Sequence, residues 1–120
     1  MPGTFDDQTR QALLDAFGAL HQNLQQAYWA ATSIEAQDRI RGIEDLVYDT
    51  LTDLNRADIQ SHDDALSQLI NGLAQAKGKI DELQGQIDLI IHNLKVAGEV
   101  IEAIKTASTA AATALAQLQG

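Results

Sequence analysis

The sequence has no cysteine, a single proline and few aromatic residues: one Trp, two Tyr and two Phe in 120 residues. Without cysteine, disulfides and thiolate metal sites are excluded. Hydrophobic residues nevertheless make up 45% of the chain, so the apolar material is mostly Ala, Leu and Ile. That composition, with the one proline at Pro2, is typical of an all-helical protein. The length predicts that residues 1–120 form a single helical domain.

Basic residues are also scarce. Eight Lys and Arg stand against 17 Asp and Glu, which gives a net charge of -9 and a pI near 4.4. Such a chain repels phosphate backbones and anionic bilayers, so nucleic-acid binding is not expected. No apolar run reaches the ~18 to 20 residues that span a bilayer, and the first ten residues lack the pattern of a cleaved signal peptide. We expect a soluble protein, cytoplasmic by default, with secretion by a leaderless route left open.

The clearest pattern lies between Leu66 and Leu118, where apolar residues recur at alternating steps of three and four. Every position of this stripe is apolar except Ser108, and no charge falls on it. Such a heptad pattern indicates a helix that lies against partner helices. The stripe comprises Leu66, Leu69, Leu73, Ala76, Ile80, Leu83, Ile87, Ile90, Leu94, Ala97, Ile101, Ile104, Ser108, Ala111, Leu115 and Leu118.

Two shorter stripes precede it, and their phases do not match. The first comprises Leu13, Phe17, Leu20, Leu24, Ala27 and Ala31, and the second Ala36, Ile40, Ile43, Val47, Thr50, Leu54 and Ala57. The phase change predicts a helix boundary between Ala31 and Ile34. Three pairs resemble capping boxes at predicted helix starts: Thr4 with Asp7, Thr32 with Glu35, and Ser61 with Asp64. The predicted helices are therefore 5–31, 33–57 and 62–118.

Whether residues 62–118 form one helix or two depends on four glycines, Gly72, Gly78, Gly85 and Gly98. Each costs about 0.5 to 1 kcal/mol relative to Ala inside a helix, which favours two helices. The stripe, however, passes all four without a change of phase, and this favours one helix of roughly 80 Å with a left-handed supercoil. The predicted fold is all-α: an elongated antiparallel helical hairpin or bundle, with two N-terminal helices packed along one long C-terminal coiled-coil helix.

The second half of this predicted helix is apolar around most of its circumference from Leu89 onward, and the helix at 5–31 has a similarly broad face. In a hairpin both broad faces meet at one end, where they present more apolar surface than two helices cover. We therefore expect a homo-oligomer or a helical protein partner. The expected interaction residues are Tyr28, Trp29, Leu89, Ile91, Val96, Val100, Ile104 and Leu115.

Tyr28 and Trp29 lie beside the predicted boundary and have two interpretations. They either plug the junction between the first two helices or anchor a partner or a lipid surface, since an indole suits an interface that is apolar at one end and wet at the other. Ser108 also has two: a bond back to a carbonyl of the preceding turn, or a role in fixing the register between neighbouring helices.

The polar residues form no recognisable catalytic or metal-binding pattern. Asp88 and His92 are four residues apart without a third ligand at a fixed spacing, and His62 lies at a predicted helix start. No phosphate-binding loop or nucleophile elbow occurs. We expect four carboxylates to face solvent, those of Glu44, Asp45, Asp49 and Asp53. We therefore expect no catalytic residues, no cofactor and no metal.

Two hypotheses for function follow. The first is a non-catalytic interaction or assembly protein that self-associates or docks on another helical protein through its broad apolar faces. The alternative is a membrane-active or lipid-surface protein, such as a pore former or a coat, that exposes the apolar segment 89–118. The net charge and the scarcity of Lys and Arg disfavour the alternative.

Overall fold

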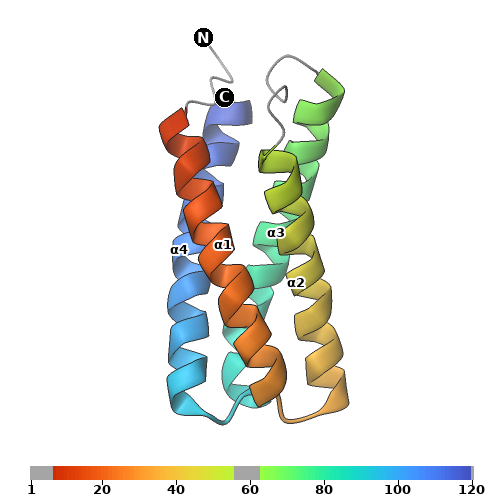
Figure 1. The fold of residues 1–120 in the computed structure, drawn as a ribbon, viewed down its shortest axis with the longest axis vertical. Helices are drawn as coiled ribbons and strands as arrows, with labels where there is room; N and C mark the ends of the chain where they lie inside the picture. Colours follow the sequence, from red (N-terminus) through yellow and green to blue (C-terminus); the bar gives the residue numbers. More distant parts are fainter. Residues whose placement is uncertain (1–6, 56–62, 120) are drawn as a thin grey trace.

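The computed structural model describes residues 7–55 and 63–119 and is an antiparallel bundle (Figure 1). Its described part contains four helices: α1 (Asp7–Ala30), α2 (Ile34–Leu54), α3 (Asp63–Ile90) and α4 (Leu94–Gln119). Helices α1 and α3 each pack against both α2 and α4, so the order around the bundle follows the order along the chain. The molecule measures 46 × 20 × 19 Å. The prediction of an all-α bundle is confirmed.

The predicted boundary between Ala31 and Ile34 is also confirmed, although a different residue caps the helix. The side chain of Ser33 accepts a hydrogen bond from the amide of Ala36 at 3.1 Å, which satisfies one of the free amides at the start of α2. Thr32, the predicted cap, instead donates its backbone N–H to the carbonyl of Ile90 at 3.0 Å. This bond ties the α1–α2 turn to the chain at the end of α3.

The prediction of one continuous helix over 62–118 is wrong, because residues 91–93 form a turn that separates α3 from α4. Asn93 is the residue that starts the new helix. Its side-chain Oδ1 accepts hydrogen bonds from the amides of Lys95 at 3.1 Å and Val96 at 3.2 Å. An asparagine in this position is a strong N-cap. Figure 1 shows the two turns side by side, and an isolated antiparallel bridge joins Ala31 to Ile91.

The stripe failed as a guide to continuity because α4 is apolar on more than one face. In α3 the predicted positions from Leu69 to Ile87 are buried. In α4 only every second residue of the predicted stripe is buried. The remaining buried residues, Val100, Ala107 and Ala114, belong to a second apolar row beside the stripe. The buried α4 residues are Ala97, Val100, Ile104, Ala107, Ala111, Ala114 and Leu118. Leu94 is exposed and Ile101, Ser108 and Leu115 are only half-buried. A segment with two apolar rows matches many phases, so its agreement with the α3 phase carries little information.

The four helices bury most of the two broad faces against each other. The fully buried side chains include Leu13, Phe17, Leu20 and Leu24 of α1 and Ile40, Val47 and Leu54 of α2. At about 1.5 to 3 kcal/mol for each large aliphatic side chain, this core is the main favourable term in folding. The hairpin layout would have left part of the two broad apolar faces uncovered, whereas the bundle covers most of them within one chain. The proposed caps Thr4 and Ser61, and the stripe residues Ala57 and Leu66, lie outside the residues whose side chains are described.

Ser108 joins two helices instead of bonding within its own. Its Oγ donates to Oδ1 of Asp81 at 2.7 Å, which links α4 to α3. Lys77 donates to the other oxygen of Asp81 at 2.8 Å. Partial burial by itself would raise the pKa of Asp81, but the hydrogen bonds from Lys77 and Ser108 and the Lys77 charge outweigh it and hold that pKa below its ordinary value of 3.8. Of the two interpretations of Ser108, the structure favours the interhelical one.

Candidate interaction surfaces

The structure separates the predicted interaction residues into two groups. Trp29 and Leu89 are 79% and 75% exposed. The other six belong to the bundle's own interior: Ile91, Val100 and Ile104 are buried, and Tyr28, Val96 and Leu115 are half-buried against the core. Trp29 therefore does not plug the α1–α2 junction. The buried residues stabilise the fold and are not available to a partner in this structure.

Exposed apolar side chains concentrate at the end of the bundle that carries the two turns. Five large apolar side chains are exposed in the described part of the chain, and four lie within five residues of a turn: Trp29, Ile34, Leu89 and Leu94. The fifth is Tyr48, in the middle of α2. Helices α1 and α3 end at Ala30 and Ile90, and α2 and α4 begin at Ile34 and Leu94, so corresponding bounds differ by 60 residues. The two hairpins thus place their exposed apolar residues at equivalent positions.

A groove runs between α1 and α4. Near the turns it encloses about 750 Å³, and a second hollow of about 480 Å³ continues it along the same two helices. Small residues form much of its lining: Ala12, Ala16 and Ala19 from α1, and Gly98, Ala103, Thr106, Thr109 and Ala110 from α4. Leu94, 84% exposed, stands at its edge. The groove is the remaining uncovered part of the two broad apolar faces predicted from the sequence.

The charges along this groove nearly balance. Asp15, Glu99 and Glu102 stand against Lys95 and Lys105, which gives a net charge of -1. The whole chain, by contrast, carries -9. Apart from its own helix backbone and its two chain neighbours, a Cβ added at Gly98 would have no heavy atom of the described residues within 4 Å, so the space in front of this glycine is open. The groove is therefore a surface that another polypeptide can approach closely and without strong net repulsion.

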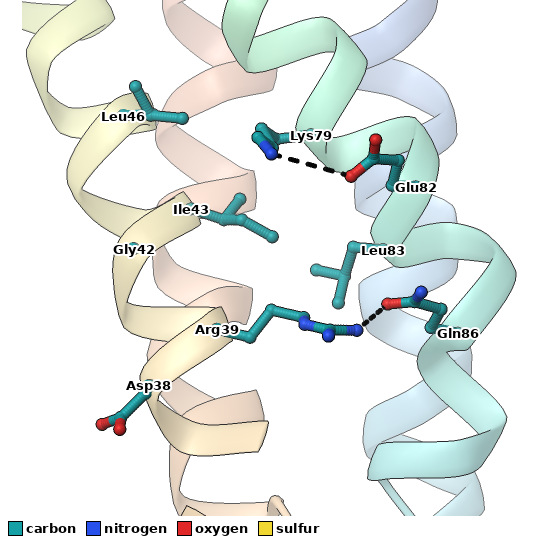
Figure 2. Close-up of a pocket in the computed structure, with 9 residues that line it drawn as sticks. All are labelled: Asp38, Arg39, Gly42, Ile43, Leu46, Lys79, Glu82, Leu83 and Gln86. Atoms are coloured by element: carbon teal, nitrogen blue, oxygen red, sulfur yellow. Dashed lines mark hydrogen bonds and ion pairs between the residues drawn. The ribbon is translucent and has the colours of Figure 1, made fainter. Parts of the chain in front are cut away.

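A smaller hollow of about 450 Å³ lies between α2 and α3 (Figure 2). Ile43 and Leu83 point into it from the two helices, and Arg39 crosses it to donate a hydrogen bond to Gln86. Lys79 and Glu82 form an ion pair at 3.9 Å along its rim. Because four of its polar side chains pair with one another, this hollow is best explained as a solvated seam between helices that polar side chains bridge.

The α1–α2 face contains a buried acidic residue that the sequence did not reveal. Glu44 was expected to face solvent with Asp45, Asp49 and Asp53, but it is 9% exposed. Its Oε1 lies 3.6 Å from Nε2 of His21, and its Oε2 lies 3.6 Å from Nε of Arg41. Both distances exceed the usual hydrogen-bond length of about 2.7 to 3.2 Å. Oε2 is buried and has no hydrogen-bond partner within residues 7–55 and 63–119.

Two aromatic side chains line a hollow together with this carboxylate. A hollow of about 310 Å³ is lined by Gln25, Tyr28, Trp29, Arg41 and Glu44. The rings of Tyr28 and Trp29 meet edge to face with centroids 5.1 Å apart, and the Arg41 guanidinium carbon lies 4.3 Å from the centre of the Tyr28 ring. The sequence pattern indicated Tyr28 and Trp29 but not Glu44. Glu44 lies off the α2 stripe, next to Ile43 and among acidic residues, so its position predicts a solvent-exposed side chain.

Within 7–55 and 63–119, no three His, Asp or Glu side chains gather closely enough to hold a metal ion. None of the helices, over its described residues, has the length and apolarity needed to cross a lipid bilayer.

The fold and these surfaces define the class: an antiparallel four-helix bundle with an apolar groove on one face and an aromatic pocket on another. No protein-family model matches the chain, and no curated protein or solved structure is significantly similar to it.

Proposed function

We propose that this protein is a non-catalytic helical assembly protein that self-associates through the α1/α4 groove. The observation that carries the proposal is that one surface combines a long, small-residue groove with the exposed Leu94 at its edge. An isologous contact between two copies requires a self-complementary surface, because the same patch serves both sides. A projecting leucine and a groove floored by alanine and glycine meet that requirement.

The charges also favour a second copy as the occupant. The chain is strongly acidic overall, so two copies repel each other at most relative orientations. The groove is nearly neutral, and its α4 side carries both signs of charge, with Glu99 and Glu102 between Lys95 and Lys105. When two copies of α4 run antiparallel and cross at Gly98, Lys95 of one copy comes opposite position 101 of the other, next to its Glu102.

Gly98 provides the sharpest test. Gly98→Gln places a side chain in the groove, and its Cβ meets no heavy atom of the described residues within 4 Å apart from its own helix backbone, so it should block association with little effect on the fold. Gly85→Gln is the matched control, since Gly85 is an exposed glycine in α3 with equally open space. Both substitutions should stabilise the helix by about 0.5 kcal/mol or more. Only Gly98→Gln should weaken self-association, by about tenfold or more.

The measurement is sedimentation velocity over a concentration series, supported by light scattering. A second pair of variants tests the apolar contact at the groove. Leu94→Ser should weaken association, whereas Tyr48→Ser, which removes an exposed side chain on α2, should not. A wild-type protein that remains monomeric at all concentrations refutes the proposal. Equal weakening by Gly98→Gln and Gly85→Gln would refute the assignment of the surface.

Binding to lipid is the competing explanation for the exposed apolar residues, and the same proteins test it. Flotation with neutral phosphatidylcholine vesicles should leave the wild-type protein in the soluble fraction. Co-flotation that Leu94→Ser or Trp29→Ser abolishes would replace self-association by a lipid-surface function.

A further inference from the structure

Beyond self-association, we propose that the pocket between α1 and α2 binds an alkylguanidinium group, which its Glu44 carboxylate holds against Tyr28 and Trp29 after Arg41 has moved aside. The pocket has about 310 Å³ of space and lies apart from the α1/α4 groove, with which it shares no lining residue. The inference therefore stands independently of the proposed assembly surface.

The unsatisfied carboxylate is the first reason. A buried carboxylate oxygen without a hydrogen bond has lost its contacts with water and gained nothing in return, which destabilises the folded state. Such groups in native structures require an explanation. Glu44 Oε2 is buried and accepts no hydrogen bond from the described residues, and its ion-pair partner Arg41 approaches only to 3.6 Å. The site therefore has a strong acceptor whose bonding capacity is not used.

The resident arginine shows which chemistry the pocket accepts. The Arg41 guanidinium lies over the ring of Tyr28, 4.3 Å from its centre, and its Nε faces Glu44. A guanidinium is planar, stacks on aromatic faces and donates two parallel N–H bonds to one carboxylate, which an ammonium group does not. Arg41 makes the stacking contact but not the carboxylate hydrogen bonds.

A guanidinium that is not attached to α2 can make both contacts. Arg41 and Glu44 are three residues apart on one helix, and this constrains the approach of the Arg41 side chain to the carboxylate. The Arg41 side chain is 53% exposed, so it can turn into solvent at little cost. His21 of α1 lies 3.6 Å from the other carboxylate oxygen of Glu44. Trp29, 79% exposed, forms the outer wall and becomes covered when a ligand enters.

Trp29 is also the only tryptophan of the chain, so its fluorescence reports on this pocket. The wild-type protein is titrated with ethylguanidinium chloride up to about 50 mM, a range suited to dissociation constants near 1 mM. Sodium chloride at equal ionic strength and ethylammonium chloride serve as reference titrations. We expect a saturable fluorescence change with ethylguanidinium, a weaker response to ethylammonium and none to sodium chloride. Amide chemical shifts of α1 and the start of α2 should titrate with the same constant.

Three variants test the roles of the residues. Glu44→Gln keeps the shape of the side chain and should lower the affinity by about tenfold or more, because a charge-assisted pair of hydrogen bonds is lost. Asp45→Asn, the same charge change at the exposed neighbouring residue, should leave the affinity unchanged. Arg41→Gln removes the resident cation and should raise the affinity, a readout that remains decisive even where Glu44→Gln impairs folding.

The source of the group is distinguished by a second probe, the capped peptide acetyl-Gly-Arg-Gly-amide. Binding at least as tight as that of ethylguanidinium identifies an arginine of a partner protein as the natural occupant. Exclusion of the peptide, with ethylguanidinium still bound, identifies a free small guanidinium compound. The proposal is overturned by a wild-type protein without a saturable response, by unchanged affinity in Glu44→Gln, or by no gain in affinity in Arg41→Gln.

Discussion

The turn between α3 and α4 depends on one side chain, and its replacement gives a measurable prediction. Asn93→Ala removes the two hydrogen bonds that Oδ1 accepts from the amides of Lys95 and Val96. Removing an asparagine N-cap costs about 0.5 to 2 kcal/mol. Asn93 is exposed, so water replaces part of what is lost, and we expect a value near 1 kcal/mol. For a chain of this size the melting temperature should fall by about 3 to 6 °C.

Asn71→Ala is the matched control, because Asn71 is an exposed asparagine inside α3. There the same substitution improves helix propensity and should stabilise the protein by about 0.5 kcal/mol. The two variants should therefore differ by about 1.5 kcal/mol with opposite signs relative to wild type. Urea denaturation followed by far-UV circular dichroism measures both. If Asn93→Ala is as stable as wild type, the cap does not hold the break. If Asn71→Ala falls below Asn93→Ala, the helix assignment itself is in error.

Two further predictions concern the core and the α3–α4 seam. Leu83→Ala, at a fully buried position, should lower the free energy of unfolding by about 2 to 5 kcal/mol. Leu89→Ala, at a residue that is 75% exposed, should change it by less than about 0.5 kcal/mol. Urea denaturation at low protein concentration measures both, and similar losses in the two variants would refute the assigned burial. The lowered pKa of Asp81 means that its contribution to stability is present above pH ~4 and is lost as the pH falls through the folded-state value. Asp81→Asn should therefore reduce the loss of stability on acidification below pH ~4. Asp88→Asn, at an exposed position on the same helix, provides the reference. Equal profiles of stability against pH for wild type and Asp81→Asn would contradict the role of the Lys77 and Ser108 hydrogen bonds.

Sequence patterns predicted the helices best where each helix has one apolar row. In α2 every described position of the predicted stripe, from Ala36 to Leu54, is buried. The α1–α2 boundary was predicted because the apolar phase changes there, and the structure places a turn at 31–33. The specific cap was missed by one residue, since Thr32 and Ser33 are both good N-caps and the choice between them depends on the tertiary bond from Thr32 to Ile90.

The predicted interaction residues differ in how far the structure exposes them. Trp29 and Leu89 were expected to take part in contacts and are exposed, but Val100 and Ile104 from the same prediction lie in the core. Periodicity tells which residues prefer to leave water but not whether a partner or the same chain covers them. The exposure of a residue depends on the number of helices in the bundle, which the missed turn after Ile90 changed.

By itself the sequence determined the helical class, the rows of buried residues in α1, α2 and α3 and the acidic surface, because these depend on composition and local periodicity. Tertiary structure decided three features that no local pattern contains. It closed two hairpins into one bundle through the paired turns at Ala31 and Ile91. It left the α1/α4 groove open where small residues from distant segments meet. It also placed Glu44 opposite His21, so that a carboxylate at the edge of a solvated face became a buried acceptor.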